Sequence, residues 1–459
     1  MSSTRTEKDS LGSMQVPTDA LYGAQTARAI DNFPISGQPI PRPLLYALVL
    51  IKQQAALVNA DLELLDKDRA AAISSAADEI LNGKHDAQFP VDIYQTGSGT
   101  SSNMNANEVI ARRAGQLLGA EDGGKPLHPN DEVNLGQSSN DVFPSAIHIA
   151  CAQQLQGKLL PALQQLEKLL TAKSSEFANV IKIGRTHLQD ATPLTFGQVF
   201  SGYARQIQLA QDRLATESSG LYELPLGGTA VGTGINTHPE FAQRTIFHLA
   251  QKTRLPFREA SNHFEAQAAR DALVAVSGSL KACAVSLSKI ANDIRLLGSG
   301  PRCGYGELQL PAVQPGSSIM PGKVNPVMAE SLIQVCARVI GNDASVTLCG
   351  LGGYFELNTM MPLMAAAMLE SIELLSNATS LFGDRCLSGL QANQERCAEL
   401  MEQSLALVTS LAPVIGYDRA ADLAKQAFQE RKTIRQLLLA EQILPEEEIT
   451  RLLDPEQMI

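Results

Sequence analysis

Eight apolar residues between positions 273 and 297 recur at alternating intervals of three and four, and this repeat constrains the fold more than any other feature of the chain. They are Leu273, Val276, Leu280, Cys283, Leu287, Ile290, Ile294 and Leu297. Such spacing is typical of a helix that packs along one seam against other helices. A helix of about 30 residues spans roughly 45 Å, too long for a small domain to cover. The repeat therefore predicts a bundle of very long helices, contributed by this chain alone or together with other subunits.

Helical spacing of apolar residues extends over most of the chain. It predicts helices at 42–63, 67–82, 104–118, 141–171, 193–216, 265–297 and, in segments, 327–380. Residues 1–40 are expected to be irregular, because Pro17, Pro34, Pro39 and the following Pro41 would interrupt regular structure, whereas short helices are expected after about residue 390. The predicted fold class is mainly α, with an N-terminal domain at 1–137, a central long-helix domain at 138–394 and a small helical domain at 395–459.

Composition narrows the classes of function. The 459 residues carry a net charge of −11 without a run of Lys or Arg, which argues against nucleic-acid binding. The seven cysteines are scattered without a C-x-x-C pair, a pattern typical of reduced thiols in the cytoplasm. Residues 1–10 are polar and do not resemble a targeting peptide, and no run of about 18 apolar residues predicts a membrane span. We therefore expect a cytoplasmic protein that does not enter a membrane.

The segment 316–326, Gly-Ser-Ser-Ile-Met-Pro-Gly-Lys-Val-Asn-Pro, combines two hydroxyls, an amine and an amide in a loop that precedes a helical run. Pro326 suits the first position of that helix, with Asn325 as its N-cap. Lys323 and the free N–H groups of the helix start would together attract an anion. The alternative is an ordinary loop-to-helix junction with a good cap.

Three further polar loops, at 97–103, 137–141 and 184–190, also lie at or near predicted helix starts. Together the four loops supply hydroxyl, amide, imidazole and ammonium groups suited to carboxylate oxygens. Taken singly, each loop is more typical of a helix cap, and the sequence does not show that they converge. The chain has no Walker A, H-E-x-x-H, G-x-G-x-x-G or G-x-S-x-G motif, and its isolated histidines predict no metal site.

Together with the segments 96–100 and 128–131, these loops resemble the motifs of class II fumarate hydratases, members of the fumarase/aspartase superfamily. The resemblance extends over nearly the whole chain. It implies a three-domain fold whose long helices assemble into the core of a homotetramer, with each active site shared between three subunits and no metal or organic cofactor. It also implies the reversible anti addition of water to fumarate, giving L-malate, in the tricarboxylic acid cycle.

The resemblance also assigns roles to individual residues. Ser317 matches the base that removes the C3 proton of malate, His187 the residue that exchanges a proton with the leaving water, and Glu330 the acidic residue that supports this site. Substrate binding falls to Ser98, Gly99, Thr100, Ser138, Ser139, Asn140, Thr186, Ser318, Lys323, Val324 and Asn325. A second, non-catalytic dicarboxylate site falls to His128, Pro129, Asn130 and Asp131, with Lys125 as a further candidate.

The chemistry agrees with the residue types. Removing a proton beside a carboxylate gives a carbanion whose charge spreads into that carboxylate as an aci form, and donors aimed at it favour the transition state. Lys323 and the following helix can act in this way, with a dipole contribution of about 0.3–2 kcal/mol. A serine hydroxyl is a weak base, so Ser317 depends on the same positive groups.

Other functions compete with this interpretation. Aspartate ammonia-lyase shares the scaffold, but Gly322, Ser98 and Ser139 favour the hydratase. A non-catalytic structural homologue would not need Ser317, His187 and Lys323 together. A serine hydrolase built on Ser317 and His187 is the most remote alternative.

Overall fold

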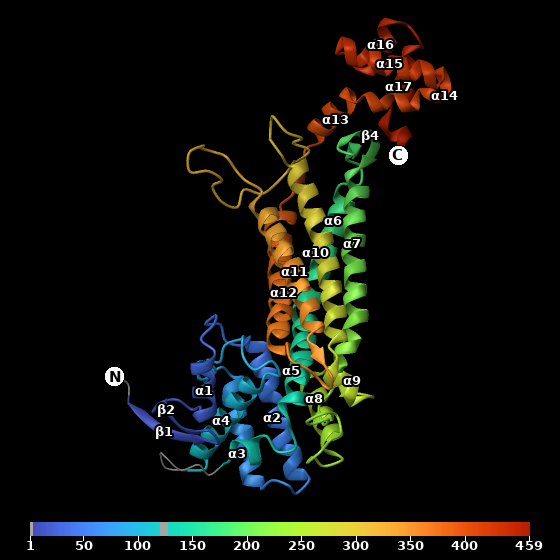
Figure 1. Ribbon diagram of the computed structural model, residues 1–459. Coiled ribbons are helices and arrows are strands. Elements are labelled where there is room, and N and C mark those ends of the chain that lie inside the picture. The colour runs from blue at the N-terminus through green and yellow to red at the C-terminus, as the bar shows by residue number, and fades with distance from the viewer. Residues whose placement is uncertain (1–2, 120–126) are drawn as a thin grey trace. The chain divides into compact units, whose positions relative to one another are not determined.

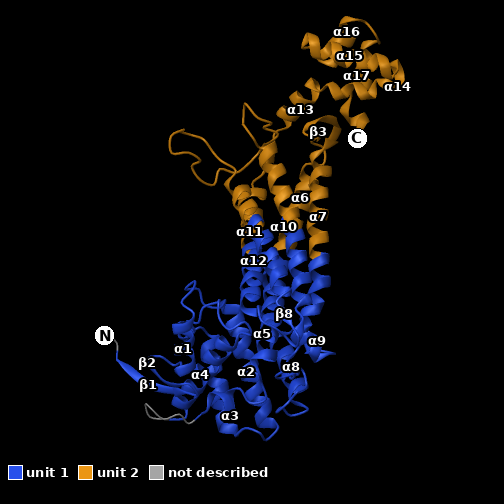
Figure 2. Cartoon of the chain, viewed as in Figure 1, with its two compact units in different colours: residues 1–161, 212–284, 337–376 blue, residues 162–211, 285–336, 377–459 orange. Residues whose placement is uncertain are grey.

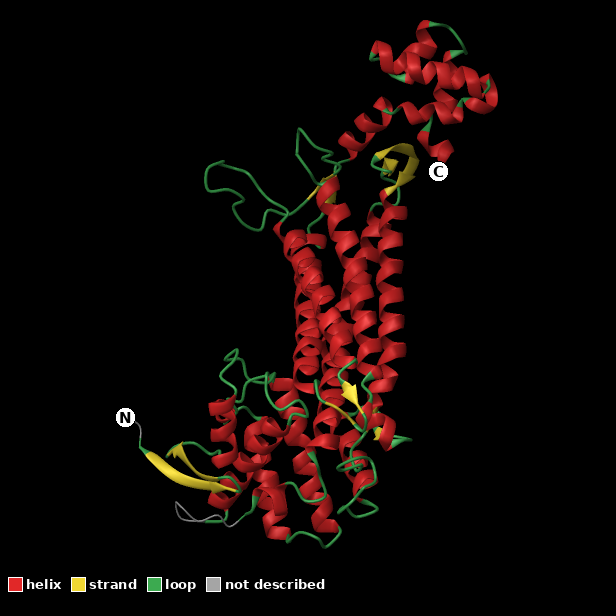
Figure 3. Ribbon diagram, in the orientation of Figure 1, coloured by secondary structure: helices red, strands yellow, loops and turns green. Residues whose placement is uncertain are grey.

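The computed structural model of the protein describes residues 3–119 and 127–459. Helices dominate (Figure 3). Among the described residues, the strands pair into two-stranded sheets. The described chain divides into two compact units, which Figure 2 colours separately. Unit 1 comprises residues 1–161, 212–284 and 337–376, and unit 2 comprises residues 162–211, 285–336 and 377–459. The predicted mainly α fold class is confirmed.

Unit 1 contains the N-terminal elements and parts of the long helices (Figure 1). Its complete helices and strands are β1 (Thr4–Asp9), β2 (Gly12–Pro17), α1 (Ala24–Asn32), α2 (Arg42–Asp61), α3 (Lys67–Leu81), η1 (Asp86–Gln88), α4 (Thr100–Leu117), η2 (Pro129–Val133), α5 (Ser139–Gln154), η3 (Leu155–Leu159), η4 (Ser219–Tyr222), β5 (Glu223–Leu224), α8 (Phe241–Thr253), β6 (Arg258–Glu259), α9 (His263–Ala268), β8 (Gly353–Tyr354) and β9 (Leu357–Asn358).

Unit 2 contains two further hydrogen-bonded strand pairs and the C-terminal helices. Its elements are β3 (Ile181–Thr186), β4 (Gln189–Thr195), β7 (Leu308–Gln309), η5 (Gly383–Leu387), β10 (Gln391–Ala392), α13 (Gln394–Gln403), η6 (Leu405–Ser410), α14 (Ala412–Ile415), α15 (Tyr417–Glu430), α16 (Ile434–Ala440), α17 (Glu446–Leu452) and η7 (Pro455–Met458). Five long helices contribute residues to both units: α6 (Leu160–Glu176), α7 (Phe196–Ser218), α10 (Asp271–Leu297), α11 (Val327–Gly350) and α12 (Met361–Phe382).

The apolar repeat lies on α10 and is buried, as predicted. Seven of its eight members, from Leu273 to Ile294, are at most 1% exposed, and only Leu297 is half-buried. Polar side chains add specific contacts between the long helices. In unit 1, Ser277 of α10 donates to Asp343 of α11 at 2.8 Å, and in unit 2, Tyr203 of α7 donates to Asp293 of α10 at 2.8 Å.

Several predicted element boundaries are wrong. Residues 1–40 are not irregular, because β1 and β2 form an antiparallel hairpin and α1 follows them. The helix expected from residue 193 begins at Phe196, after strands β3 and β4. Thr195 and Gln198 cap its start reciprocally, each side chain accepting from the other's backbone N–H at 3.0 Å.

The C-terminal helices form an apolar core of their own within unit 2. It is built from Ile183, Met401, Leu407, Leu411, Leu423, Ala427, Ile434, Leu437, Leu438, Ile449 and Leu453. Because Ile183 belongs to β3, this core also anchors the β3–β4 hairpin to the C-terminal helices.

Among the described residues, two helices, α2 and α10, are long and apolar enough to cross a membrane by length and composition alone. Within the chain, 83% of the apolar window of α2 and 50% of that of α10 is buried. Core helices of soluble proteins meet the same criterion, so the expected absence of a membrane span stays a prediction.

Candidate active site

The hydroxyls of Ser98, Thr100 and Ser139 form a chain in unit 1. Thr100 Oγ1 lies 2.7 Å from Ser98 Oγ and 2.7 Å from Ser139 Oγ. Thr100 is the first residue of α4 and Ser139 the first residue of α5, so two helix N-termini meet at this chain. Each N-terminus adds free N–H groups and a partial positive charge, which suits a carboxylate.

Glycines allow the 96–100 loop to take this path. A Cβ on Gly97 would lie 1.8 Å from the carbonyl oxygen of Thr359. Gly99 has a φ of 74°, and a Cβ there would lie 2.4 Å from the ring of Phe143. No other residue type fits these two positions without displacing the loop.

The second part of this group, residues 138–140, is fixed by a capping box at the start of α5. Ser138 Oγ accepts from Asn140 N at 3.2 Å, and Asp141 Oδ1 accepts from Ser138 N at 2.9 Å. Asp141 is fully buried, and its other carboxylate oxygen accepts from Gly227 N and Thr229 N. Burial raises the pKa of Asp141 to about 6 despite these bonds.

His187 lies at the tip of the β3–β4 hairpin in unit 2. Thr186 pairs with Gln189, so His187 and Leu188 are the two central residues of the turn, with φ values of 55° and 61°. Positive φ at both positions is the geometry of a type I′ turn, which normally takes Asn or Gly. Thr186, His187 and Leu188 are all exposed. The turn therefore presents the imidazole to solvent at a cost in backbone strain, as functional sites often do.

A buried ion pair holds the base of this hairpin. Arg185 Nη1 donates to Glu307 Oε2 at 2.6 Å, and Glu307 is 0% exposed. The guanidinium of Arg185 also lies 4.4 Å from the centroid of the Tyr305 ring. These contacts orient the strand that ends in Thr186.

The 316–326 loop is closed on itself. Gly316 N donates to Lys323 O at 2.8 Å, and Asn325 Nδ2 donates to Gly316 O at 2.6 Å. A Cβ on Gly316 would lie 2.5 Å from Lys323 O, so the closure requires glycine. Helix α11 begins at Val327, and its first i→i+4 bond runs from Glu330 N to Pro326 O. The predicted N-cap is therefore wrong, because Pro326 holds the cap position and the Asn325 amide closes the loop instead.

Within this loop, Ser317 Oγ accepts hydrogen bonds from two backbone amides, Ile319 N at 3.2 Å and Met320 N at 3.0 Å. Two N–H donors on one hydroxyl oxygen favour its deprotonated form. Ser317 is half-buried, whereas Ser318, Lys323 and Val324 of the same loop are exposed. Glu330 lies half-buried in the first turn of α11.

The second predicted site, at 128–131, lies mostly exposed at the surface of the chain. His128 Nδ1 lies 3.0 Å from Asp131 Oδ2, and the two side chains are 56% and 79% exposed. His128 also caps η2, which contains Pro129, Asn130 and Asp131. Lys125 lies outside the described residues.

Comparison with known proteins decides the family. A lyase family model matches residues 12–341, and a model of the fumarase C C-terminus matches residues 407–459. A class II fumarate hydratase from Methylorubrum extorquens is 54% identical, with 99% of this chain and 97% of that protein covered. Another from Nitrosomonas europaea is 50% identical over 100% and 99%. The crystal structure of a class II fumarase from Schistosoma mansoni matches with a TM-score of 0.96 at 42% identity, covering 99% of both chains.

The chain belongs to the class II fumarate hydratase family. The resemblance inferred from its motifs is thereby confirmed, and the chain is an enzyme of the lyase class.

In this member of the fumarate hydratase family, the predicted site residues fall into three groups. The structure joins the first group, Ser98, Thr100 and Ser139, by hydrogen bonds within unit 1. The second group is Thr186 and His187, and the third is Ser317 to Glu330; both lie in unit 2. Within residues 3–119 and 127–459, no hydrogen bond or ion pair joins His187 to Ser317 or Glu330.

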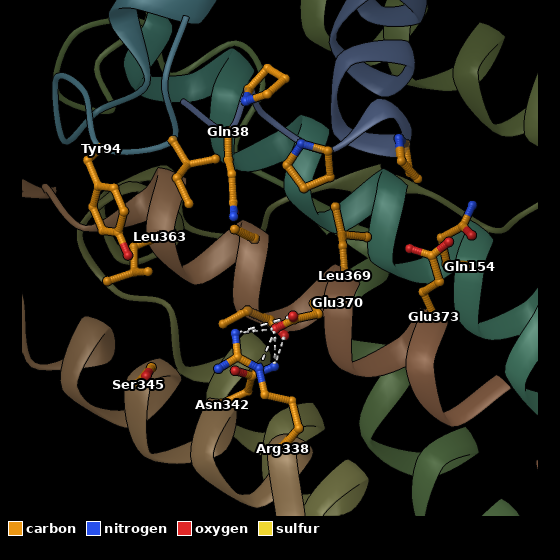
Figure 4. Close-up of a pocket in the computed structure, with 16 residues that line it drawn as sticks. Gln38, Tyr94, Gln154, Arg338, Asn342, Ser345, Leu363, Leu369, Glu370 and Glu373 are labelled. Atoms are coloured by element: carbon orange, nitrogen blue, oxygen red, sulfur yellow. Dashed lines mark hydrogen bonds and ion pairs between the residues drawn. The ribbon is translucent and has the colours of Figure 1, made fainter. Parts of the chain in front are cut away.

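Two cavities in unit 1 of this fumarate hydratase family member differ in whether predicted site residues line them. A cavity of about 350 Å³ is lined by Arg338, Asn342 and Glu370 among others, but by none of the predicted site residues (Figure 4). A cavity of about 250 Å³ is lined by Thr96, Thr100 and Arg28. We give weight to the smaller cavity, because it borders the hydroxyl chain.

Two buried charged residues, Lys52 and Glu307, support loops that carry predicted site residues in this fumarate hydratase family member, and neither was predicted from the sequence. Lys52 is fully buried on α2 beneath the 134–137 turn, and Glu307 is fully buried behind the hairpin. The only available signal for Lys52 was a lysine within an otherwise apolar helical run. In the described part of the chain, no group of three or more His, Cys, Asp or Glu side chains is arranged to hold a metal ion.

Proposed function

We propose that this chain catalyses the reversible hydration of fumarate to L-malate, and that each active site combines the three residue groups from three copies of the chain. The observation that carries the proposal is the environment of Ser317, whose oxygen receives two backbone N–H bonds in the same closed loop that carries the exposed Lys323. This is how a weakly basic hydroxyl can be made to accept a proton from carbon.

The first group would bind one end of the dicarboxylate. Ser98, Thr100, Ser138, Ser139 and Asn140 offer hydroxyl and amide donors at two helix N-termini, and Gly99 allows close approach. Asn140 Nδ2 donates to Ala230 O at 2.8 Å in the free chain, so it would exchange that bond for one to substrate. Thr186, Ser318, Lys323, Val324 and Asn325 would complete the binding site.

The reaction, written from malate, needs a base and an acid. Ser317 as the alkoxide takes the C3 proton, and the electron pair of the C–H bond moves into the adjacent carboxylate as the aci form. Lys323 and the N-terminus of α11 stabilise that charge. The C2–O bond then breaks, and the hydroxyl leaves as water with a proton supplied through His187, which Glu330 supports. Hydration follows the same steps in reverse, with anti geometry.

Exposed apolar residues on the long helices support assembly into a homotetramer. Ile340, Ala344 and Leu348 follow one another at four-residue intervals on α11 and are exposed, with Ile340 at 40% and Leu348 at 64%. Val285 on α10 is 55% exposed. Apolar residues aligned along one helix face favour burial against another copy. Such packing would also bring donor groups of different copies together.

We extend the proposal to cofactors, location and domains. Lys323, helix N-termini and backbone amides supply the positive charge that the mechanism needs, so we propose that no metal or organic cofactor takes part.

Six of the seven free cysteines are buried, which fits a reducing cytoplasm, where the enzyme would serve the tricarboxylic acid cycle. We retain the second dicarboxylate site at His128–Asp131 and the three domains 1–137, 138–394 and 395–459 as parts of the proposal.

Ultraviolet absorbance of the fumarate double bond tests the proposed activity. With L-malate as substrate, the absorbance should rise, and with fumarate and water it should fall. Turnover of L-aspartate instead of malate would reassign the protein as an ammonia-lyase, and turnover of neither would favour a structural homologue.

A further inference from the structure

Residues 98–100 and 138–140 are the two donor loops of unit 1. A buried polar cluster adjoins both of them. Its centre is Lys52, a residue of α2 that is 0% exposed. Lys52 Nζ donates to Asn134 Oδ1 at 3.3 Å and approaches Gln137 Oε1 at 3.5 Å. A lysine is rarely buried so completely unless its ammonium group has a purpose that compensates for the lost hydration.

The two acceptors of Lys52 bracket the turn that leads into the 138–140 loop. Asn134 Nδ2 donates to Gln137 O at 3.0 Å, and Gln137 Nε2 donates to Val133 O at 3.1 Å. Asn59 lies seven residues after Lys52, on the same face of α2, and donates to Leu135 O at 3.0 Å. Helix α2 therefore fixes this turn at two points, one of them through an ammonium group.

The same cluster reaches the other donor loop. Asn103, on α4, donates through Nδ2 to Asn134 Oδ1 at 3.2 Å, the oxygen that also accepts from Lys52. Asn103 lies one turn after Thr100, and Gln137 directly precedes Ser138. The cluster thus links the first turn of α4 with the start of α5, in addition to the direct contact between Thr100 and Ser139.

We propose that Lys52 is a positioning residue of the active site, which sets the distance between the Ser98–Thr100 loop and the Ser138–Asn140 loop through Asn134 and Gln137. This inference rests on the proposed function, because these loops are substrate-binding only if that function holds. The inference adds to the proposed function a residue that does not touch the substrate and yet determines how the substrate is held.

The charge state of Lys52 fits a role that goes beyond packing. Burial lowers the pKa of Lys52 to about 7, while the carboxylate of Asp141 raises it. Lys52→Met leaves Asn134 Oδ1 with Asn103 as its donor but removes the ammonium group that faces Gln137 Oε1. A buried acceptor that loses its donor lowers the stability of the folded chain. A purely structural account therefore expects Lys52→Met to lower the Tm but to keep the kcat/KM of the folded enzyme.

The test compares steady-state kinetics and thermal unfolding of four proteins: wild type, Lys52→Met, Ser139→Ala and the double variant. We expect Lys52→Met to lower the Tm modestly and, at a temperature where it is fully folded, to lose about 10–100-fold in kcat/KM, since a displacement near 1 Å in a binding loop can cost that much. The double variant should lose less than the product of the two single losses, because both act on the same loop.

Lys173→Met is the matched control. Lys173 is also a buried lysine that donates to a backbone carbonyl, that of Leu390 at 2.6 Å, but it contacts neither donor loop. We expect its kcat/KM to stay within threefold of wild type.

Wild-type kcat/KM in Lys52→Met, or losses in the double variant that multiply fully, would overturn the inference. If Lys52→Met does not fold, Gln137→Met removes one acceptor alone and should lose at least tenfold; wild-type activity there would likewise overturn it. Failure of the proposed function is distinguishable, because the wild-type enzyme would then not interconvert fumarate and malate at all.

Discussion

Thr100 Oγ1 and Ser139 Oγ lie 2.7 Å apart, although the two residues belong to different helices and are separated by 39 positions in the chain. Each is the first residue of its helix, so the contact aligns two helix N-termini on one point. A carboxylate at that point would meet hydroxyl donors, free backbone N–H groups and two dipole ends of the same sign. We therefore propose that this point of unit 1 binds one carboxylate of the substrate.

Removing the hydroxyl of Thr100 should weaken substrate binding. Thr100→Val keeps the shape of the side chain but leaves Ser98 and Ser139 without their shared partner. A lost partner in a desolvated site costs about 1–3 kcal/mol, so kcat/KM should fall by roughly 5–150-fold, mainly through KM. Ser75→Ala is the control, since Ser75 is an exposed residue of α3 whose hydroxyl donates to Ala71 O at 2.9 Å within its own helix. Equal losses in both variants would count against the assignment.

Removing the hydroxyl of Ser317 should slow the proton-transfer step strongly and leave substrate binding largely unchanged. A positioned base contributes about 10²–10⁴-fold, so Ser317→Ala should lower kcat by that factor with little change in KM. Ser331→Ala removes an exposed hydroxyl from α11 and should behave as wild type. Near wild-type kcat in Ser317→Ala would disprove its role as base.

His187→Asn separates the imidazole from the turn that carries it. Asn adopts positive φ readily, so the β3–β4 hairpin and the assembly should remain. We expect kcat to fall by about 10²–10⁴-fold, because the proton exchanged with the leaving water loses its carrier. Leu188→Asn places the same side chain at the other central position of the turn and should retain activity. If both variants lose activity equally, the turn and not the imidazole is responsible.

Sequence reasoning succeeded where one local rule dominated. The three-and-four repeat on α10 predicted a buried seam, since a helix has only one face that returns with this period. It failed for residues 189–195, because Thr192-Pro193 looks like a helix start, whereas the true cap is Thr195 with Gln198. The His187–Leu188 turn carries no Asn or Gly and so gives no hairpin signal. Lys52 could not be placed, because its partners lie 82 and 85 residues away.

The pH dependence of stability should reveal the buried His148. Burial and the nearby Arg270 lower the pKa of His148 to about 4, and its Nδ1 lies 2.9 Å from the carbonyl oxygen of Glu223. Between pH 6.5 and 4 the unfolded chain binds a proton at this residue and the folded chain does not, so stability falls as the pH falls. Urea unfolding at both pH values should show a smaller drop for His148→Gln than for wild type. Equal drops would contradict the assignment.

Complementation between two inactive variants tests the central claim, that different copies of the chain share each active site and supply its Ser317 and His187 separately. Ser317→Ala and His187→Asn chains are unfolded together at equal concentration, refolded, and assayed for conversion of L-malate to fumarate. If the two residues of one site come from different copies, random assembly leaves roughly a quarter of the sites with both intact, and activity should recover to about that fraction of wild type. If both residues of a site come from one chain, no mixed site is intact. Activity that stays at the level of the separate variants would contradict the account.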